Sequence, residues 1–149
     1  MPDQIIVLMD LDNFKEISNE QGWTKYRPNI ITGTLTQLIL DLVGKYAATV
    51  IYGLNEKEGT EECMLLFSSI YLEDLLQDLE HIRAEIERLG KISKTNATIS
   101  IGVAVGKSID NKPAKSRKKE YLITDPIRKF AKNALKVAKR SGGNRIIIR

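Results

Sequence analysis

An apolar run near the start of the chain limits the fold more than any other feature. It begins with Ile5-Ile6-Val7-Leu8-Met9 and ends in Asp10-Leu11-Asp12. A continuous run of β-branched and aliphatic residues predicts a buried central strand over 4–10. Because side chains alternate along a strand, Asp10 and Asp12 are expected on the same side of its end. The chain must therefore build a sheet around a strand that ends in two carboxylates.

Hydrophobic periodicity predicts the remaining elements. After the first strand we expect a loop that contains Gly22. Apolar residues at helical spacing predict helices over 28–46, 72–89 and 126–140. We expect Gly90 to stop the second of them and Asp125 to cap the third. Short apolar runs predict strands over 48–53, 63–70, 95–105 and 146–148.

The order of these elements predicts an α+β fold. It fits a ferredoxin-like βαββαβ palm plan, an antiparallel sheet with helices on one face, extended by a C-terminal helix and strand. A length of 149 residues suits one hydrophobic core, and the sequence shows no repeat or linker. We therefore expect a single domain over 1–149. A fold of this kind does not by itself determine a function.

Composition excludes several classes of protein. With 42% hydrophobic and 28% charged residues, the chain is neither a disordered acidic tail nor a membrane protein. Its apolar runs are far shorter than the ~20 residues of a membrane-spanning helix, and no signal peptide is expected. The single cysteine, Cys63, excludes an internal disulfide. These features predict a cytoplasmic protein without a membrane partner.

The net charge of +4 is the sum of two opposite regions. Residues 1–106 carry 9 basic and 16 acidic side chains, a net charge of −7. Residues 107–149 carry 14 basic and 3 acidic side chains, a net charge of +11. Such a division fits a site that gathers cations in one place and anions in another, or simply two solvated surfaces.

Acidic residues provide the first candidate site. Asp10 and Asp12 repel each other unless a cation or a proton lies between them, and Mg²⁺ prefers such carboxylates together with phosphate oxygens. The alternative is a strand that ends in polar residues, with Asp12 in a turn. Four glutamates in the following hairpin could lie near Asp10 or form a solvated turn: Glu56, Glu58, Glu61 and Glu62.

The last predicted helix provides the second candidate. Lys132, Lys136 and Lys139 are spaced by four and three residues and share one face. That face could hold a triphosphate or a nucleic acid. Part of this charge is explained by the helix dipole, which favours cations at the C-terminus. His81 and Cys63 have no partners that suggest zinc or nucleophilic chemistry and are expected to be structural.

Three segments together resemble the GGDEF-type nucleotidyl cyclases. Residues 8–17 (LMDLDNFKEI) resemble the first metal-binding motif of that family, residues 97–104 (ATISIGVA) its late strand, and residues 131–145 (AKNALKVAKRSGGNR) its closing helix and turn. The three segments occur in the family order and extend over nearly the whole chain. The resemblance implies a palm-type fold.

The resemblance also implies roles for particular residues. Asp10 would bind two metal ions, Mg²⁺ or Mn²⁺, and the Leu11 carbonyl would complete one metal shell. Backbone N–H groups near Asn13, Phe14 and Lys15 would hold the triphosphate, and Lys139 would bind its terminal phosphates. A ribose hydroxyl would attack the α-phosphorus and pyrophosphate would leave, with two metal ions assisting both events.

The chain departs from the family at its signature motif. Residues 59–63 (GTEEC) occupy the place of the GGDEF sequence and keep its acid pair, so that Glu61 would be a metal ligand and Glu62 the second acid. Another register aligns Tyr52-Gly53 with the residues before the motif, which puts Leu54 and Asn55 at the acid positions and implies an inactive protein. We favour the first register because residues 64–67 (MLLF) then match the family strand.

The base-reading positions depart as well. The family asparagine and aspartate correspond to Ser18 and Arg27, and Arg27 cannot accept hydrogen bonds from guanine. These differences resemble the stand-alone minimal CRISPR polymerases. That group implies a homodimer that makes a cyclic di- or oligonucleotide from a nucleoside triphosphate, most simply ATP, in antiviral defence.

Two other functions are weighed against this one. Residues 22–24 (GWT) and Arg27-Pro28 faintly resemble archaeal GTP cyclohydrolase III, which shares the palm fold and its Mg²⁺. The other alternative is an inactive palm that binds nucleotide or RNA through a basic loop, and direct nucleic-acid binding is the less favoured reading. That loop contains Lys112, Lys115, Arg117, Lys118 and Lys119.

Overall fold

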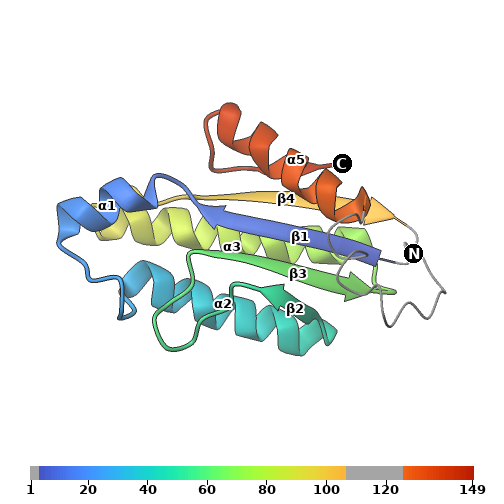
Figure 1. Cartoon of the computed structure of the whole chain (residues 1–149), viewed down its shortest axis with the longest axis horizontal. Helices are drawn as coiled ribbons and strands as arrows, with labels where there is room; N and C mark the ends of the chain where they lie inside the picture. Colours follow the sequence, from blue (N-terminus) through green and yellow to red (C-terminus); the bar gives the residue numbers. More distant parts are fainter. Residues whose placement is uncertain (1–3, 107–125) are drawn as a thin grey trace, which may run out of the picture.

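A computed structural model describes residues 4–106 and 126–149 of the chain (Figure 1). The described strands are β1 (Gln4–Leu11), β2 (Thr49–Tyr52), β3 (Glu62–Ser68), β4 (Ile99–Gly106) and β5 (Ile146–Ile148). The described helices are α1 (Phe14–Gln21), α2 (Ile30–Tyr46), α3 (Leu72–Ile92) and α5 (Pro126–Arg140). The predicted basic loop and the predicted cap at Asp125 lie outside the described residues.

The strands form one sheet in the order β2-β3-β1-β4-β5. β1 lies at its centre and pairs antiparallel with both β3 and β4. Asp10 therefore lies opposite Glu62 on one side and Ser100 on the other. β5 adds to the outer edge in parallel with β4. The α+β palm fold with an additional C-terminal helix and strand is confirmed.

Helices cover both faces of this sheet. Ile5, Val7 and Met9 point from β1 into the larger core, which α2 and α3 close. Ile6 and Leu8 point into a smaller core that includes apolar residues of α5. In Figure 1, α5 lies on the side of the sheet opposite α2 and α3. The ferredoxin-like core thus has its two helices on one face as predicted, and the added helix covers the other.

Gly102 explains how closely α5 approaches the sheet. A Cβ at this position would lie 2.5 Å from the Ala131 carbonyl oxygen and 2.5 Å from the Leu135 nitrogen. Only a residue without a side chain permits this contact between strand and helix backbones. Ala131, Ala134 and Ala138 are fully buried beneath the helix. The small residues bring α5 close to the sheet, and Lys139 of this helix reaches the end of β1.

Several predicted boundaries are wrong: α2 begins at Ile30 and not at 28, and β4 begins at Ile99 and not at 95. The expected loop after β1 contains the helix α1, which buries Phe14 and Ile17 and ends at Gly22. α3 continues past Gly90 to Ile92. At Gly90 a Cβ would lie 2.3 Å from the Ala97 carbonyl oxygen, so this glycine permits a close crossing of the chain and does not end the helix. In the described parts of the chain, no helix has the length and apolar character needed to cross a membrane.

Candidate active site

A tight turn before β3 directs the acid pair toward β1. Gly59 has a φ of +94°, and a Cβ there would lie 2.2 Å from the hydroxyl oxygen of Thr32 in α2. The next residue, Thr60, is fully buried, and its hydroxyl forms a hydrogen bond of 2.8 Å with that of Thr36. The turn is therefore fixed against α2, with Glu61 and Glu62 directly after it. The Leu11 amide donates to the Glu61 carbonyl at 3.0 Å, which joins this segment to the end of β1.

The structure brings five of the sequence-predicted residues to one pocket of about 470 Å³. They are Phe14, Lys15, Ser18, Arg27 and Glu61. The pocket extends from the start of α1 across to the turn before β3. Trp23 also lines it and packs against Phe14 with ring centroids 5.9 Å apart. The pocket therefore combines cations, the carboxylates of Glu58 and Glu61, and an aromatic wall.

Two asparagines in this pocket are already engaged by the protein. Asn29 caps α2, and its side-chain oxygen accepts from the amides of Ile31 and Thr32. Asn55 accepts from two backbone amides of its own turn and donates to Glu58 at 3.1 Å. The sequence predicted no ligand for either asparagine, and we assign none to them in this pocket. Lys15, Ser18 and Arg27 are the polar residues of the pocket that the sequence predicted to bind a nucleotide.

Asp10 does not line this pocket and lies on the face of the sheet that carries α5. Its carboxylate is about one-third exposed and forms an ion pair of 3.2 Å with Lys139. Burial raises the pKa of Asp10; Lys139 opposes this rise, while the carboxylates of Glu62 and Asp12 add to it. The Tyr52 hydroxyl donates to Glu62 at 3.2 Å, and burial together with Glu62 raises the pKa of Tyr52 to about 12. Asp10 is thus an accessible acid whose negative charge is incompletely compensated.

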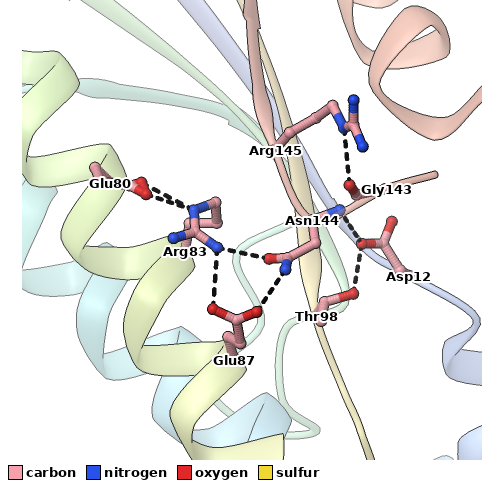
Figure 2. A network of polar contacts seen from close by, with 8 residues as sticks. All are labelled: Asp12, Glu80, Arg83, Glu87, Thr98, Gly143, Asn144 and Arg145. Atoms are coloured by element: carbon pink, nitrogen blue, oxygen red, sulfur yellow. Dashed lines mark hydrogen bonds and ion pairs between the residues drawn. The ribbon is translucent and has the colours of Figure 1, made fainter. Parts of the chain in front are cut away.

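Asp12 lies in a different environment, shown in part in Figure 2. One carboxylate oxygen accepts from the Thr98 hydroxyl and the Asn144 amide, each at 2.8 Å. The other accepts from the Ser100 hydroxyl and from Lys139, each at 2.7 Å. Burial alone would raise the pKa of Asp12, but these hydrogen bonds outweigh it and lower the pKa. Asp12 is a buried anion that joins β1, β4 and the turn after α5.

A second layer of contacts holds that turn against α3 (Figure 2). Arg83 donates to the side-chain oxygen of Asn144 at 2.8 Å, and the Asn144 amide group donates to Glu87 at 2.7 Å. Arg83 also pairs with Glu80 and Glu87 on its own helix. Asn144 has a φ of +52°, a conformation that asparagine tolerates. Both its side chain and its backbone therefore fix the turn that contacts Asp12.

The Lys139 ammonium lies among four oxygen atoms at the end of β1. It contacts the Asp12 carboxylate at 2.7 Å, the backbone oxygens of Asp10 and Leu11 at 3.1 Å each, and the Asp10 carboxylate at 3.2 Å. The structure thus places it directly on the predicted metal ligands. Lys132 and Lys136 lie on the same helix but are exposed to solvent. Their predicted role with phosphate stays a prediction.

The other predicted metal ligands form no preassembled all-protein cage. Within residues 4–106 and 126–149, no three side chains of His, Cys, Asp or Glu converge on one point. Asp10, the Leu11 carbonyl and Glu61 provide hard oxygen donors, which is the type that Mg²⁺ binds while it keeps water or phosphate for its remaining positions. The Lys139 ammonium contacts two of these groups, the Leu11 carbonyl and the Asp10 carboxylate. A cation of the protein thus lies where a metal ion was expected.

Sequence reasoning missed the partners of Asp12. Thr98 and Ser100 lie within the segment identified by resemblance, but nothing in the sequence pattern assigned them a role. The alternation of Thr98 and Ser100 on one strand face was the available signal, since it matches that of Asp10 and Asp12. Arg83 and Glu87 read as ordinary surface charges of an amphipathic helix. Their contact with Asn144 depends on the tertiary fold.

Comparison with solved structures places this geometry among known folds. The active GGEEF domain of a diguanylate cyclase from Vibrio cholerae matches 99% of this chain and 83% of its own, with a TM-score of 0.63 and 20% identity. The FimX GGDEF domain from Pseudomonas aeruginosa gives a TM-score of 0.63 at 18% identity, over 99% of this chain and 81% of that one.

A more distant match is the Csm1-Csm4 cassette in complex with cA4. It has a TM-score of 0.52 and 13% identity, and the match covers 99% of this chain but 21% of that one. No protein-family model matches the sequence, and no curated protein matches it. At these identities the similarity concerns the fold alone. The chain has the GGDEF-like palm fold, with the predicted acids at the end of its central strand.

Proposed function

We propose that this chain is a divalent-metal-dependent nucleotidyl cyclase. The observation that carries the proposal is the convergence of five sequence-predicted residues on one pocket, whose Glu61 is joined through its carbonyl to the Leu11 amide at the end of β1. The pocket volume of about 470 Å³ is in the range of small-molecule sites. The similarity to GGDEF domains and to a complex that contains a cyclic oligonucleotide supports the same class of reaction. The product would be a cyclic di- or oligonucleotide, with release of pyrophosphate.

Asp10, the Leu11 carbonyl and Glu61 are the groups that would hold Mg²⁺ or Mn²⁺. When bound there, the metal would favour ionisation of the attacking ribose hydroxyl and stabilise charge on the leaving pyrophosphate. We do not assign Asp12 as a direct ligand, because its oxygens already accept four hydrogen bonds from the protein. We assign to Asp12 the positioning of Lys139 and of the turn after α5.

The chain's own groups would hold the triphosphate in place. The first turn of α1 follows Asn13, which makes no side-chain cap, so its backbone N–H groups are free to bind an anion. Lys15 lines the pocket next to them. Lys139 does not line the pocket, and its ammonium lies at the end of β1, where it would contact the terminal phosphates. Charges from the acidic and the basic parts of the sequence thereby meet at one nucleotide.

The base end of the pocket favours ATP over GTP. Arg27 lies where the resemblance places a carboxylate that reads guanine, and its guanidinium only donates hydrogen bonds. Ser18 replaces the second base-reading side chain. Adenine lacks the N1–H and N2 donors that require a carboxylate. A role in antiviral signalling follows from the resemblance to the minimal CRISPR polymerases and is part of the same proposal.

The first experiment incubates the protein with each of the four nucleoside triphosphates and Mg²⁺ or Mn²⁺, followed by mass spectrometry. We expect pyrophosphate and a cyclic adenine nucleotide. Asp10→Asn should reduce product at least about a thousandfold, whereas Asp41→Asn, an exposed acid of α2, should not. Absence of pyrophosphate with all four nucleotides would reject the proposal, and a ring-opened guanine product would favour the cyclohydrolase.

Cyclisation also predicts an assembly. Joining two nucleotides into a ring needs two pockets that face each other, so the active form is proposed to be a homodimer. Sedimentation with and without a non-hydrolysable ATP analogue should show a dimer at least in the presence of the analogue. A monomer that nevertheless makes the cyclic product would contradict this part of the proposal.

A further inference from the structure

The Lys139 ammonium has the surroundings of a bound metal ion. Four protein oxygens lie between 2.7 and 3.2 Å from it, two of them backbone carbonyls and two from carboxylates. An ammonium has three protons to donate, so four oxygen neighbours exceed what hydrogen bonding alone requires. The arrangement is a cation site built from hard oxygen donors. In this structure a side chain of the same molecule fills it.

Two of the four oxygens, the Leu11 carbonyl and the Asp10 carboxylate, belong to groups to which the proposed function assigns the metal. A divalent ion would lie about 2.1 Å from the Leu11 carbonyl oxygen, and Lys139 lies 3.1 Å from that atom. The two cations would therefore be no more than about 5 Å apart wherever the metal lies around the oxygen. Repulsion at that distance is large in a partly buried site. Metal and ammonium therefore compete for the end of β1.

Lys139 is able to leave this position without unfolding of the helix. Its side chain is 31% exposed and extends from α5 on a flexible stem. Asp12 retains three other hydrogen bonds when the ammonium moves. A triphosphate in the pocket offers the ammonium a second set of oxygens. The nucleotide thus has the means to draw Lys139 off the metal ligands.

From these observations we propose that Lys139 is an internal counter-cation that keeps the nucleotide-free site closed to divalent metal. The inference rests on the proposed function, because it takes the nucleotide as the group that releases Lys139. Its consequence is ordered binding: the metal enters with the nucleotide and not before it. Without nucleotide, the ammonium prevents the carboxylates from taking up free metal ions.

The test measures metal binding without turnover. Binding of Mn²⁺ alone to the full chain is followed by electron paramagnetic resonance for wild type, Lys139→Met and Lys139→Arg. We expect Lys139→Met to bind Mn²⁺ at least about tenfold more tightly than wild type, since it removes a positive charge from the site. Lys139→Arg keeps the charge and should remain as weak as wild type. Lys129→Met, an exposed lysine on the same helix, is the matched control and should also resemble wild type.

Further variants keep the test decisive. If Lys139→Met does not fold, as judged by circular dichroism, Lys139→Gln removes the charge with a polar side chain that Asp12 can still contact. Adding Asp10→Asn to either variant should abolish the gained Mn²⁺ affinity. Equal Mn²⁺ affinity in wild type and the uncharged variant would overturn the proposal, as would a gain in Lys129→Met.

The outcome is independent of product formation. If the protein releases no pyrophosphate from any nucleotide but Lys139→Met gains Mn²⁺ affinity, the proposed reaction fails and the counter-cation stands. If the protein makes product while the uncharged variants bind Mn²⁺ no better than wild type, the counter-cation fails and the reaction stands.

Discussion

Two regions meet at the end of β1, and they use carboxylates in opposite ways. On the anchored side, formed by Asp12 with its partners from β4 and the turn after α5, the carboxylate accepts four hydrogen bonds and its pKa is lowered. On the second side, which begins at Asp10 and extends to Glu61, Glu61 is exposed, Asp10 is about one-third exposed, and partial burial raises the pKa of Asp10.

Within three residues of sequence, one carboxylate is fully engaged by the protein and the other is not. An anion whose oxygens are all engaged by the protein holds elements together and has nothing left to offer a ligand. An anion that is incompletely compensated gains from a cation or a proton. The two acids of this segment therefore have different environments, and the following predictions test whether they also differ in role.

The largest expected effect concerns the anchored side. Asp12→Ala leaves the hydroxyls of Thr98 and Ser100, the Asn144 amide and Lys139 without their acceptor. Removing one partner of a buried charged network typically costs about 3–5 kcal/mol, and we expect that loss in the free energy of unfolding. Urea denaturation measures it. Asp41→Ala, at an exposed acid, should change stability by less than about 0.5 kcal/mol; a loss below about 1 kcal/mol for Asp12→Ala would contradict the anchored role.

A glycine tests the same side without removing any charge. Gly143 has a φ of +75°, and a Cβ there would lie 2.8 Å from an Asp12 carboxylate oxygen. We expect Gly143→Ala to cost about 2–4 kcal/mol from overpacking and backbone strain together. Gly22→Ala is the matched control, because its φ of +68° is similar and a Cβ there would contact nothing within 4 Å.

The difference between these two alanine variants isolates the contact with Asp12. Gly22→Ala should show backbone strain alone, about 1 kcal/mol. Thermal or urea unfolding of both proteins under one set of conditions gives the comparison. Equal losses at the two glycines would mean that the turn can move away from Asp12, and the anchored side would then be less rigid than its contacts indicate.

A smaller effect is expected in the pocket. Arg27→Asp together with Ser18→Asn introduces an acceptor and an amide at the positions where guanine would be read. We expect the ratio of GTP to ATP use to rise about tenfold, the effect of one or two well-placed hydrogen bonds. Competition between the two nucleotides in one reaction measures this ratio. Stability should change little, since Arg27 is exposed, and an unchanged ratio would place the base elsewhere.

The smallest effect is the dependence of stability on pH, and its sign differs between the two acids. Asp12 has a pKa below its ordinary 3.8 in the folded protein, so it stabilises above pH 3.8 and this contribution is lost as the pH falls through the lowered value. Asp10 has a pKa above 3.8 in the folded protein. Its contribution to stability is therefore fully present below pH 3.8 and is lost as the pH rises through the raised value.

Unfolding in urea between pH 3 and pH 7 separates these contributions. Asp12→Asn should lessen the loss on acidification, to which Asp78, Glu85 and Glu87 also contribute through their lowered pKa values, whereas Asp10→Asn should lessen the decline just above pH 3.8. The second change should stay below about 1 kcal/mol, because solvent screens a carboxylate that is one-third exposed. Curves of the same slope for both variants would show that the two acids share one environment.

Sequence alone predicted the sheet well because its strands are continuous apolar runs. Most side chains of β1, β3 and β4 are buried, so hydrophobicity marks these strands directly. The helix α1 was missed because it has eight residues and buries two, too few for a recognisable stripe. Gly90 was predicted to end the helix, but it permits a close approach of the Ala97 backbone. The sequence does not distinguish a glycine of this kind from one that ends a helix.

Parts of the candidate site were predictable for the same reason and others were not. Asp10 and Glu61 lie beside strands whose identity the sequence reveals. The partners of Asp12 lie 86 and 88 residues farther along the chain, and only the register of β1 with β4 brings them together. Arg83 and Glu87 look like solvent-facing charges until Asn144 is placed between them. Register and long-range polar contacts have no local pattern.

Cys63 is fully buried on β3 and lies opposite Met9, next to the acid pair. Burial raises its pKa to about 12, so the thiol is both shielded and almost fully protonated at neutral pH. A thiol-directed dye can label it only while the larger core, in which its side chain is buried, is open. The rate of labelling therefore measures how often this core opens, and the measurement needs no engineered cysteine. A ligand that stabilises this part of the protein should lower the rate of labelling.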